Sequence, residues 1–349
     1  MTKIVFITQQ VDPQHPALAA TVPKIRALAA LVDEVVVLAD GAVEGVLPAN
    51  CRVRTFRARH KLGRGLRFEA ALIRERSSLR GGAVVAHMCP IYAVLAAPLV
   101  RPLRIPLVLW FTHWRASRLL VVAERVASAV ASVDERSFPV PSRKLWAIGH
   151  GIDLSEFECL SPRNNGGELR LLALGRYSPA KGLDVVLRAV ATVGEGVRLD
   201  VYGPVLSAEE RAHRRELDHL AAELPLEGRV VLGSAVARTE VLRLLAEHDA
   251  LVNNMRAGAP DKVVYEAAAS CVPVLASNPV FDSLLEPAQL FRREDPGELA
   301  ERIRGLAALP PDDRAALGRR LRERVEEGHS VQSWARGILD AAGMSELGS

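Results

Sequence analysis

Short apolar runs alternate with amphipathic stretches along most of the chain. Apolar runs of roughly four to eight residues predict strands buried on both faces, and the amphipathic stretches between them predict helices. In the first part of the chain the expected strands are Lys3–Thr8, Glu34–Leu38, Ala83–His87, Leu107–Phe111 and Ala129–Val133. Because strands and helices take turns, we expect a parallel sheet covered by helices on both faces, which is an α/β fold.

The alternation pauses near Lys144–Phe157, where Ile148–Asp153 predicts a turn. Ser161–Glu168, which follows, predicts a polar loop, and the alternation then resumes. The later expected strands are Leu169–Leu174, Arg198–Tyr202, Val230–Leu232, Ala250–Asn253 and Val272–Leu275, and the later expected helices are Leu183–Val193, Ala208–Glu223, Pro296–Glu327 and Val331–Ala342. The pattern predicts two Rossmann-like domains facing across a cleft. We expect the first at 1–155, joined by a C-terminal helix at about 331–349, and the second at 156–330.

Composition agrees with two globular domains. The chain has 349 residues, of which 49% are apolar and 25% charged, and this length exceeds what one core usually serves. The four cysteines are scattered, so we expect neither a disulfide framework nor a zinc ribbon, and a reducing compartment is favoured. The longest uncharged stretch, Gly81–Val100, predicts a strand and a buried helix rather than a membrane span. We therefore expect a cytoplasmic protein.

Basic residues gather in the first half of the chain. Residues 1–160 hold 21 basic and 13 acidic residues, a net charge of +8, and the remainder has a net charge of −4, which together give the +4 of the whole chain. The stretch Arg52–Arg67 has seven Lys or Arg and no acid. It suits an anionic acceptor or anionic lipid headgroups at the inner face of a membrane, or it is a solvated loop. No aromatic residues interleave to stack bases, so nucleic acid is not expected. Gly63–Gly65 is expected to interrupt the chain before a helix near Leu66.

Two common nucleotide-binding motifs are absent. The turn after the first expected strand, Thr8–Pro13, has no glycine, whereas a dinucleotide fold places G-x-G-x-x-G there. Gly175 follows the first strand of the second domain, but Arg176 comes next, and no Walker-type motif occurs anywhere. A nicotinamide oxidoreductase and a P-loop NTPase are therefore not expected.

A loop with two cations follows the strand that ends at Leu174. Gly175 turns the chain, and Arg176 and Lys181 lie five positions apart before the next helix. The carboxyl ends of parallel strands face the ligand crevice, where a guanidinium and an ammonium could together neutralise a departing diphosphate. The alternative is an ordinary surface turn in an arginine-rich chain.

A second loop leads into a helix at Pro260, which suits the first helical position. The unpaired N–H groups of a first helical turn attract anions. Lys262 and Glu266 are four residues apart and so share one helix face. The helix continues as Ala267–Cys271, which predicts that it is buried. Glutamate is rarely buried without a partner, so a buried Glu266 would indicate a specific role. A carboxylate at this place can accept both hydroxyls of a ribose. The alternative is an exposed Lys–Glu pair.

Several motifs, taken in order, resemble those of the group 1 (family 4) retaining glycosyltransferases with the GT-B fold. Gly175–Gly182 is similar to the family's diphosphate-binding segment, and Tyr265–Val274 is similar to its helix and strand "L-E-A-M-A-C-G-x-P-V". Ile148–Phe157 resembles the interdomain "P-N-G-V-D…F" segment, and Trp110–Trp114 resembles the strand end that carries a sugar-contacting histidine.

The resemblance implies a metal-independent, retaining transferase without a cofactor, whose donor is a nucleotide-diphosphate sugar. It implies that Arg176 and Lys181 bind the diphosphate, that Glu266 binds the ribose and that His113 helps to place the sugar. The remaining expected donor contacts are Gly175 in the diphosphate-binding segment, Gly233 and Ser234 near the base, and Asp261, Lys262 and Val263 at the start of the helix. The acceptor, which is a glycan, a lipid-linked sugar or a small molecule, is expected in the first domain, with Asp12 and His15 as candidate contacts.

The chain also departs from the family pattern. Gly258 stands where the family has a second glutamate, and Asp261 replaces a glycine, so Asp261 and Lys262 are candidate substitutes near phosphate or sugar. Two other functions stay open: a non-catalytic nucleotide-sugar-binding partner of another transferase, and a GT-B sugar-nucleotide epimerase. Asp12 is alternatively a turn cap, His87 is expected to be structural, and His150 is expected to shape the hinge.

Overall fold

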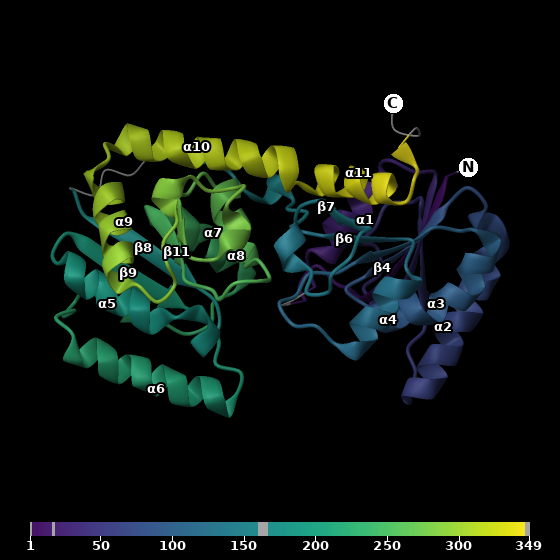
Figure 1. The fold of residues 1–349 in the computed structure, drawn as a ribbon, viewed down its shortest axis with the longest axis horizontal. Helices are drawn as coiled ribbons and strands as arrows, with labels where there is room; N and C mark the ends of the chain where they lie inside the picture. The colour runs from purple at the N-terminus through teal and green to yellow at the C-terminus, as the bar shows by residue number, and fades with distance from the viewer. Residues whose placement is uncertain (1, 16–17, 160–166, 346–349) are drawn as a thin grey trace. The chain divides into compact units, whose positions relative to one another are not determined.

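The computed structural model describes residues 2–15, 18–159 and 167–345, and the chain divides into two units. Unit 1 comprises residues 1–153 and 327–349, and unit 2 comprises residues 154–326. Each unit is built around a parallel sheet of its own (Figure 1). The loop expected at Ser161–Glu168 lies outside the described residues up to position 166.

Unit 1 has a seven-stranded parallel sheet in the order β3-β2-β1-β4-β5-β6-β7. The strands are β1 Lys3–Val11, β2 Glu34–Ala42, β3 Cys51–Thr55, β4 Ala83–His87, β5 Leu107–Trp110, β6 Ala129–Ser132 and β7 Leu145–Ala147. Strands β4, β5 and β6 are buried along their whole length. This burial explains why they appear in the sequence as continuous apolar runs rather than as alternating ones.

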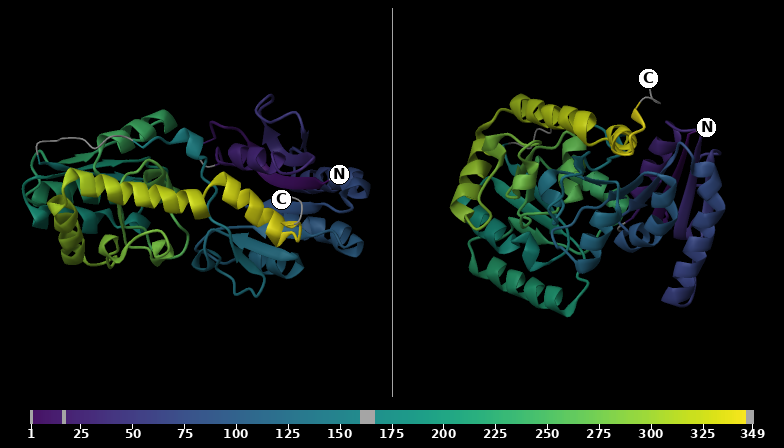
Figure 2. Two further views of the ribbon diagram at one scale, coloured as in Figure 1. Left: turned by 90° about the horizontal axis from the view of Figure 1, so that it is seen from above. Right: turned by 45° about the vertical axis from the view of Figure 1, so that its right-hand side comes forward.

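Helices cover both faces of the sheet of unit 1 (Figures 1 and 2). They are α1 Thr21–Ala29, α2 Lys61–Glu75, α3 Pro90–Val100, α4 Arg118–Val126 and α11 Val331–Ala341, with short 3-10 turns η1 Arg76–Leu79, η2 Arg101–Leu103, η3 Glu135–Ser137 and η4 Leu154–Glu156, the last at the start of unit 2. Successive β1 residues point to opposite faces. Phe6 packs edge-on against Trp334 of α11, while Val5 and Ile7 join the core beneath α2, α3 and α4.

The α11 segment is part of unit 1 although it ends the described chain. It lies against α1, and Ile152 forms a parallel bridge with Ser330. The Ile152 amide donates to the His329 carbonyl at 2.7 Å, and the Val331 amide donates to the Ile152 carbonyl at 2.9 Å. Ser330 caps α11 by accepting from the Ser333 amide. The chain therefore leaves unit 1 and returns to it at neighbouring points.

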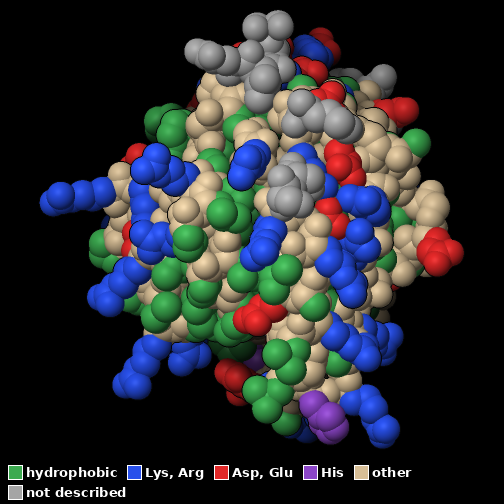
Figure 3. Space-filling view, turned by 90° about the vertical axis from the view of Figure 1, so that its right-hand side faces the viewer, with side chains coloured by type: hydrophobic (Ala, Val, Ile, Leu, Met, Phe, Trp, Pro, Cys, Tyr) green, Lys and Arg blue, Asp and Glu red, His purple; other side chains and the backbone are tan. Residues whose placement is uncertain are grey.

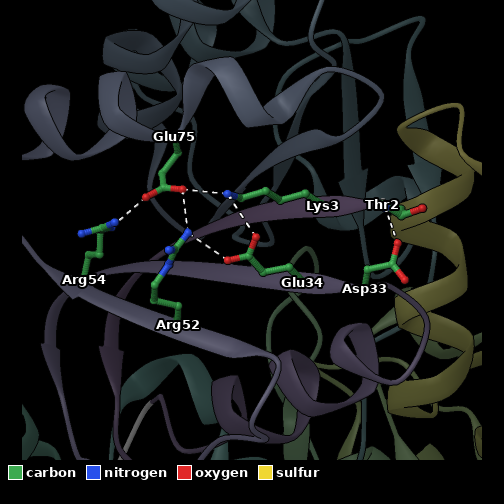
Figure 4. A network of polar contacts seen from close by, with 7 residues as sticks. All are labelled: Thr2, Lys3, Asp33, Glu34, Arg52, Arg54 and Glu75. Carbon is green, nitrogen blue, oxygen red and sulfur yellow. Dashed lines mark hydrogen bonds and ion pairs between the residues drawn. The ribbon is translucent and has the colours of Figure 1, made fainter.

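A network of charges around the buried Glu75 joins β1, β2 and β3 to α2 (Figure 4). Glu75 is 2% exposed and accepts from Lys3 Nζ at 2.7 Å, Arg52 Nη2 at 3.0 Å and Arg54 Nε at 2.7 Å. Lys3 and Arg52 also pair with Glu34, at 3.2 and 2.9 Å. Burial raises the pKa of Glu75, but its hydrogen bonds and charge interactions with Lys3, Arg54 and Arg52 outweigh burial and lower the pKa below its usual value. Arg52 and Arg54 therefore serve the fold.

Unit 2 has a five-stranded parallel sheet in the order β10-β9-β8-β11-β12. Its strands are β8 Leu169–Leu174, β9 Val197–Tyr202, β10 Val230–Leu232, β11 Ala250–Asn253 and β12 Val274–Ala276. Its helices are α5 Leu183–Val193, α6 Ala208–Glu223, α7 Arg238–Glu247, α8 Lys262–Ala269, α9 Pro296–Ala308 and α10 Pro311–Gly328, with 3-10 turns η5 Pro179–Lys181, η6 Pro279–Phe281 and η7 Pro287–Gln289. The last two residues of α10 lie in unit 1.

Two local expectations are wrong. Helix α2 begins at Lys61 and runs through Gly63 and Gly65, which were expected to interrupt it. A glycine costs a helix only about 1 kcal/mol relative to alanine, and the buried side chains Phe68 and Leu72 hold α2 against the core. The expected helix Pro296–Glu327 is two helices, α9 and α10, with Pro310 between them.

The cysteines also differ from expectation. Cys159 and Cys271 form a disulfide within unit 2, with their Cα atoms 5.0 Å apart, whereas Cys51 and Cys89 are free. The two paired residues are 112 positions apart, so their spacing gave no sign of the bond. In the described part of the chain, no helix is both long enough and apolar enough to cross a membrane.

Candidate functional site at the sheet edge of unit 2

The loop after β8 folds back over its own glycine. Gly175 has a φ of +136°, and a Cβ built on it would lie 2.5 Å from Lys181 Nζ, so only glycine leaves room for the lysine. Ser178 caps the short turn η5, and Gly182, at a φ of +51°, starts α5. This geometry carries Lys181 Nζ across Gly175 into contact with the Asp261 carboxylate.

Arg176 lies in the same loop. Its guanidinium is more than half exposed and forms an ion pair with Glu210 Oε1 at 3.2 Å. Glu210 is itself buried near the start of α6. Arg176 and Lys181 are thus both held by carboxylates, and an incoming anion has to compete with Glu210 and Asp261 for these two cations.

Gly233 and Ser234 follow β10, as expected, and a tyrosine anchors the backbone there. The Tyr177 hydroxyl donates to the carbonyls of Gly233 at 2.7 Å and Val201 at 3.1 Å, and burial raises the pKa of Tyr177 to about 12. The Arg214 guanidinium lies over the tyrosine ring and also donates to the Gly233 carbonyl at 3.2 Å. This loop is therefore fixed by side chains that the sequence motifs did not single out.

Helix α8 begins at Lys262, so Pro260 is not the first helical residue, and that expectation is wrong. Asp261 holds the N-cap position, but its side chain does not cap the helix. Instead its carboxylate accepts from Asn253 Nδ2 at 2.8 Å and from Lys181. The α8 N-terminus and the Lys181 ammonium therefore lie close together at the carboxyl edge of the sheet.

Glu266 is buried one turn into α8, as the apolar sequence around it predicts, with 5% of its surface exposed. Lys262 Nζ approaches its Oε1 atom at 2.8 Å, which places both side chains on one helix face. Arg238 Nη1 also approaches Oε1, at 2.5 Å, and Arg238 Nη2 binds Glu156 at 2.8 Å. Burial lowers the pKa of Arg238, but Glu266 and Glu156 outweigh burial and raise it. Sequence reasoning missed Arg238 and Glu156, because both lie far from Glu266 in the chain.

Two buried asparagines lie at the end of β11, Asn253 as its last residue and Asn254 just after it. Asn254 Nδ2 donates to the Gly182 carbonyl at 2.8 Å, yet the Oδ1 atoms of Asn253 and Asn254 lack a hydrogen-bond partner within the described ranges. Asn278 holds the next loop by donating to the carbonyls of Arg256 and Ala259. Gly258, in that loop, has a φ of +113°, a conformation that other residues rarely adopt.

Of the other candidate residues, His113, Asp12 and His15 lie in unit 1 and Val263 lies in unit 2. His113 follows β5, is half-buried, stacks on Trp114 and accepts from the Arg115 amide at Nδ1 at 2.9 Å. Asp12 accepts from the Gln14 amide at 2.8 Å and His15 from the Leu18 amide at 3.0 Å, so each stabilises a local turn. Val263 lies in the first turn of α8 in unit 2 and is buried.

His87 belongs to an aromatic core, as expected. It stacks on Trp110 with ring centroids 4.8 Å apart and is buried together with Phe6 and Trp334. Burial, and then the charge of Lys24, hold the pKa of His87 well below its usual value. His150, 9% exposed, lies beside the return of the chain at Ile152. Within residues 2–15, 18–159 and 167–345, no cluster of three or more His, Cys, Asp or Glu side chains suits a metal ion.

Comparison with known proteins identifies the relatives of this chain. Residues 160–324 match the family model of the group 1 glycosyl transferases. No curated protein matches the chain. Similar solved structures are HepE from Anabaena in complex with UDP (19% identity, TM-score 0.76, 98% of this chain and 99% of that one), sucrose-phosphate synthase from Thermosynechococcus elongatus (18%, 0.72, 100% of both) and a glycosyltransferase from Rickettsia africae (12%, 0.76, 100% and 99%). These full-length matches confirm the GT-B fold, and the family match confirms the resemblance that the motifs indicated.

Proposed function

We propose that this chain, whose residues 160–324 belong to the group 1 glycosyl transferases, moves a sugar from a nucleotide-diphosphate sugar to an acceptor with retention of configuration. One observation carries the proposal. Lys181, the N-terminus of α8 and the buried Glu266 gather at the carboxyl edge of the unit 2 sheet, where α/β folds bind ligands.

In this proposal the diphosphate replaces carboxylates as the partner of the cations. Lys181 leaves Asp261 and Arg176 leaves Glu210, and the amides of Lys262 and Val263 add donors at the helix N-terminus. The charge on the diphosphate grows as the bond to the sugar breaks, so these groups stabilise the transition state more than the bound donor. No metal is required, because side-chain cations and amides neutralise the leaving group.

Glu266 then accepts the two ribose hydroxyls. Its carboxylate, which pairs with Arg238 and Lys262, has two oxygens that can accept hydrogen bonds. Gly233 and Ser234 lie on the loop that would meet the base. Support for a nucleotide-sugar donor comes from HepE, which has been solved with UDP and with UDP-glucose.

Retention follows if the leaving diphosphate takes the proton of the acceptor on the face from which it departs. His113 would help to place the transferred sugar. The acceptor, whether a glycan, a lipid-linked sugar or a small molecule, would bind on the unit 1 side, where Asp12 and His15 are the proposed contacts. A cytoplasmic location, at the inner face of a membrane, belongs to the same proposal.

A thermal-shift screen over nucleoside diphosphates tests donor binding first, since a ligand that binds only the folded state raises the melting temperature. We expect one base to stand out, and the Lys181→Ala protein to lose the shift. Incubation with the matching sugar nucleotides should then release the free diphosphate. Absence of a shift with every nucleotide would contradict the proposal.

Binding without release of the diphosphate would favour the second candidate, a non-catalytic nucleotide-sugar-binding partner of another transferase. Gly258 is the observation behind this candidate, because it stands where the family resemblance implies a glutamate. Conversion of the sugar without its release from the nucleotide would instead indicate an epimerase.

A further inference from the structure

Helix α2 in unit 1 is apolar on its outer face as well as on its inner one. Phe68 and Leu72 point into the core and are fully buried, whereas Leu62 is 85% exposed, Leu66 68% and Ile73 42%. Spacings of four and seven residues place these three within about 40° on the helix surface, and Glu69, half-buried, borders the same row about 20° from Leu62. A surface helix normally carries polar residues there. The outer stripe of α2, made of Leu62, Leu66 and Ile73, is therefore an exposed apolar row bordered by one carboxylate.

Cations flank this stripe. Arg57, Arg59 and Lys61 are exposed just before and at the start of α2, and the exposed Arg67 and Arg74 lie about 80–100° further round the helix from the stripe. None of these five forms an ion pair with an acid in the described ranges. Other members of the expected basic stretch are occupied: Arg52 and Arg54 bind Glu75, and Arg64 binds Asp40 at 3.0 Å. The structure thus narrows the basic stretch to a smaller set of available charges.

The two neighbouring helices extend the same surface. α3 packs against both α2 and α4, and the three cover one face of the sheet. The exposed apolar side chains here are Ile91, Leu103, Leu119 and Val122, and the exposed arginines are Arg101, Arg104, Arg118 and Arg125. Residues 57–126 contain twelve Arg and one Lys but only three Glu. Figure 3 shows this side of unit 1, with Lys and Arg spread around hydrophobic patches.

We propose that this α2–α4 face, made of the outer surfaces of α2, α3 and α4, binds a bilayer of anionic lipids. The cations would attract the headgroups, and Leu62 and Leu66 would enter the boundary between headgroups and acyl chains, as the apolar side of an interfacial helix does. The chain would lie on the membrane without crossing it, in keeping with the absence of a spanning helix from the described residues.

The combination of charges and leucines favours a bilayer over other polyanions. A nucleic acid would gain from exposed aromatic or hydrogen-bonding side chains, whereas the exposed apolar side chains on α2 are two leucines and an isoleucine. The two leucines would gain nothing from the charged phosphates of such a polymer. A bilayer offers both an anionic layer and an apolar layer beneath it, which matches both kinds of side chain.

Vesicle flotation with the full chain tests the proposal, and it needs no sugar transfer. We expect the protein to float with vesicles of 30% phosphatidylglycerol in phosphatidylcholine, about tenfold or more better than with phosphatidylcholine alone, and less well as salt rises. Leu62→Ser with Leu66→Ser should weaken binding about tenfold, and Arg57→Gln with Arg59→Gln and Lys61→Gln should do the same and remove most of the salt dependence.

Matched controls come from unit 2. Leu206 is 67% exposed, close to the value for Leu66, so Leu206→Ser should leave binding unchanged. Neutralising the exposed Arg188, Arg211 and Arg215 removes the same charge and should have little effect. Circular dichroism checks that each variant is folded.

Equal flotation on neutral and anionic vesicles would overturn the proposal, as would controls that lose as much binding as the α2 variants. Self-association that the Leu62 and Leu66 changes abolish, without vesicle binding, would assign the face to a second copy of the chain. Salt-dependent binding to duplex DNA without vesicle binding would assign it to a nucleic acid, and either result rejects the bilayer.

Discussion

The Glu266 carboxylate lies between two cations, with Oε1 2.5 Å from Arg238 Nη1 and 2.8 Å from Lys262 Nζ. Removing one partner of a buried charged group leaves the other without compensation. Replacing Glu266 by a neutral residue would therefore leave Arg238 and Lys262 without this partner. In the wild-type protein the two cations fix the position of the carboxylate.

Glu266→Gln should weaken nucleoside diphosphate binding by about tenfold or more, because a hydrogen bond to a charged group contributes about 1.5–3 kcal/mol. The amide nitrogen that replaces one oxygen cannot accept from a ribose hydroxyl. Titration calorimetry with ribose and 2′-deoxyribose nucleotides makes the test specific. Wild type should prefer ribose and the variant should lose most of that preference; equal discrimination by both proteins would remove Glu266 from the ribose site.

Arg176→Ala and Lys181→Ala should each lower the turnover rate as well as the affinity for the donor. Their charge is needed most when the diphosphate leaves, so the loss appears in kcat and in kcat/KM. Steady-state kinetics measure both. Arg188→Ala, at an exposed arginine on α5 of the same unit, is the control and should behave as wild type. Unchanged kinetics in both site variants would refute their placement at the diphosphate.

Asp261→Asn should tighten nucleoside diphosphate binding several-fold. The Asp261 carboxylate contacts Lys181, so a diphosphate has to displace it and also approach its negative charge. Asparagine keeps the shape and can still pair with Asn253. A nucleoside without phosphates serves as the internal control in calorimetry, because its affinity should not change. Weaker diphosphate binding in this variant would mean that Asp261 helps to hold the donor.

Glu75→Gln should destabilise unit 1 by about 3 kcal/mol or more, since it removes the buried carboxylate shared by the buried Lys3 and by Arg52 and Arg54. Glu34→Gln is the matched comparison. Glu34 pairs with Lys3 and Arg52 too, but its side chain is 25% exposed, so the loss should be much smaller. Urea unfolding followed by circular dichroism measures both. Similar losses for the two variants would show that burial of Glu75 does not set its importance.

Stability should fall in mild acid, partly because of His329. Burial lowers the pKa of His329 from 6.5 to about 4. Below pH 6.5 the unfolded chain takes up a proton that the folded one refuses, so stability is full above about pH 6.5 and declines down to about pH 4. His329→Gln should reduce this decline by roughly 3 kcal/mol at most. Urea unfolding between pH 7.5 and 4.5 tests this, with the exposed His60→Gln as a control that should keep the full decline.

The sequence predicted elements best where burial decides the residue types. β4, β8, β11, α5 and α6 have the bounds expected for them, because largely buried strands and helices with one apolar face leave strong local patterns. The prediction at Gly63 and Gly65 in α2 was wrong because local propensity and packing disagree there. Local propensity favoured a break, while packing of Phe68 and Leu72, which depends on distant residues, held the helix together.

The candidate site was predictable only in part. Lys181, Asp261 and Glu266 follow from loops at strand ends and from the family resemblance, and the structure brings the first two into contact. Arg238 and Glu156 were not predictable, because an ion pair between residues 82 positions apart leaves no local trace. The same holds for Glu75 and Lys3, which are 72 positions apart, and for the bond between Cys159 and Cys271.

The return of the chain beside Ile152 makes unit 2 an insertion within unit 1. Unit 2 is one continuous segment, whereas unit 1 is assembled from both sides of it. During synthesis unit 2 is therefore complete while unit 1 still lacks α11 and the Trp334 side chain that packs against Phe6 and Trp110. A chain that stops before residue 331 keeps every strand of both sheets but leaves those aromatic rings uncovered. The nascent protein thus carries a complete unit 2 beside an incomplete unit 1 until α11 has been made.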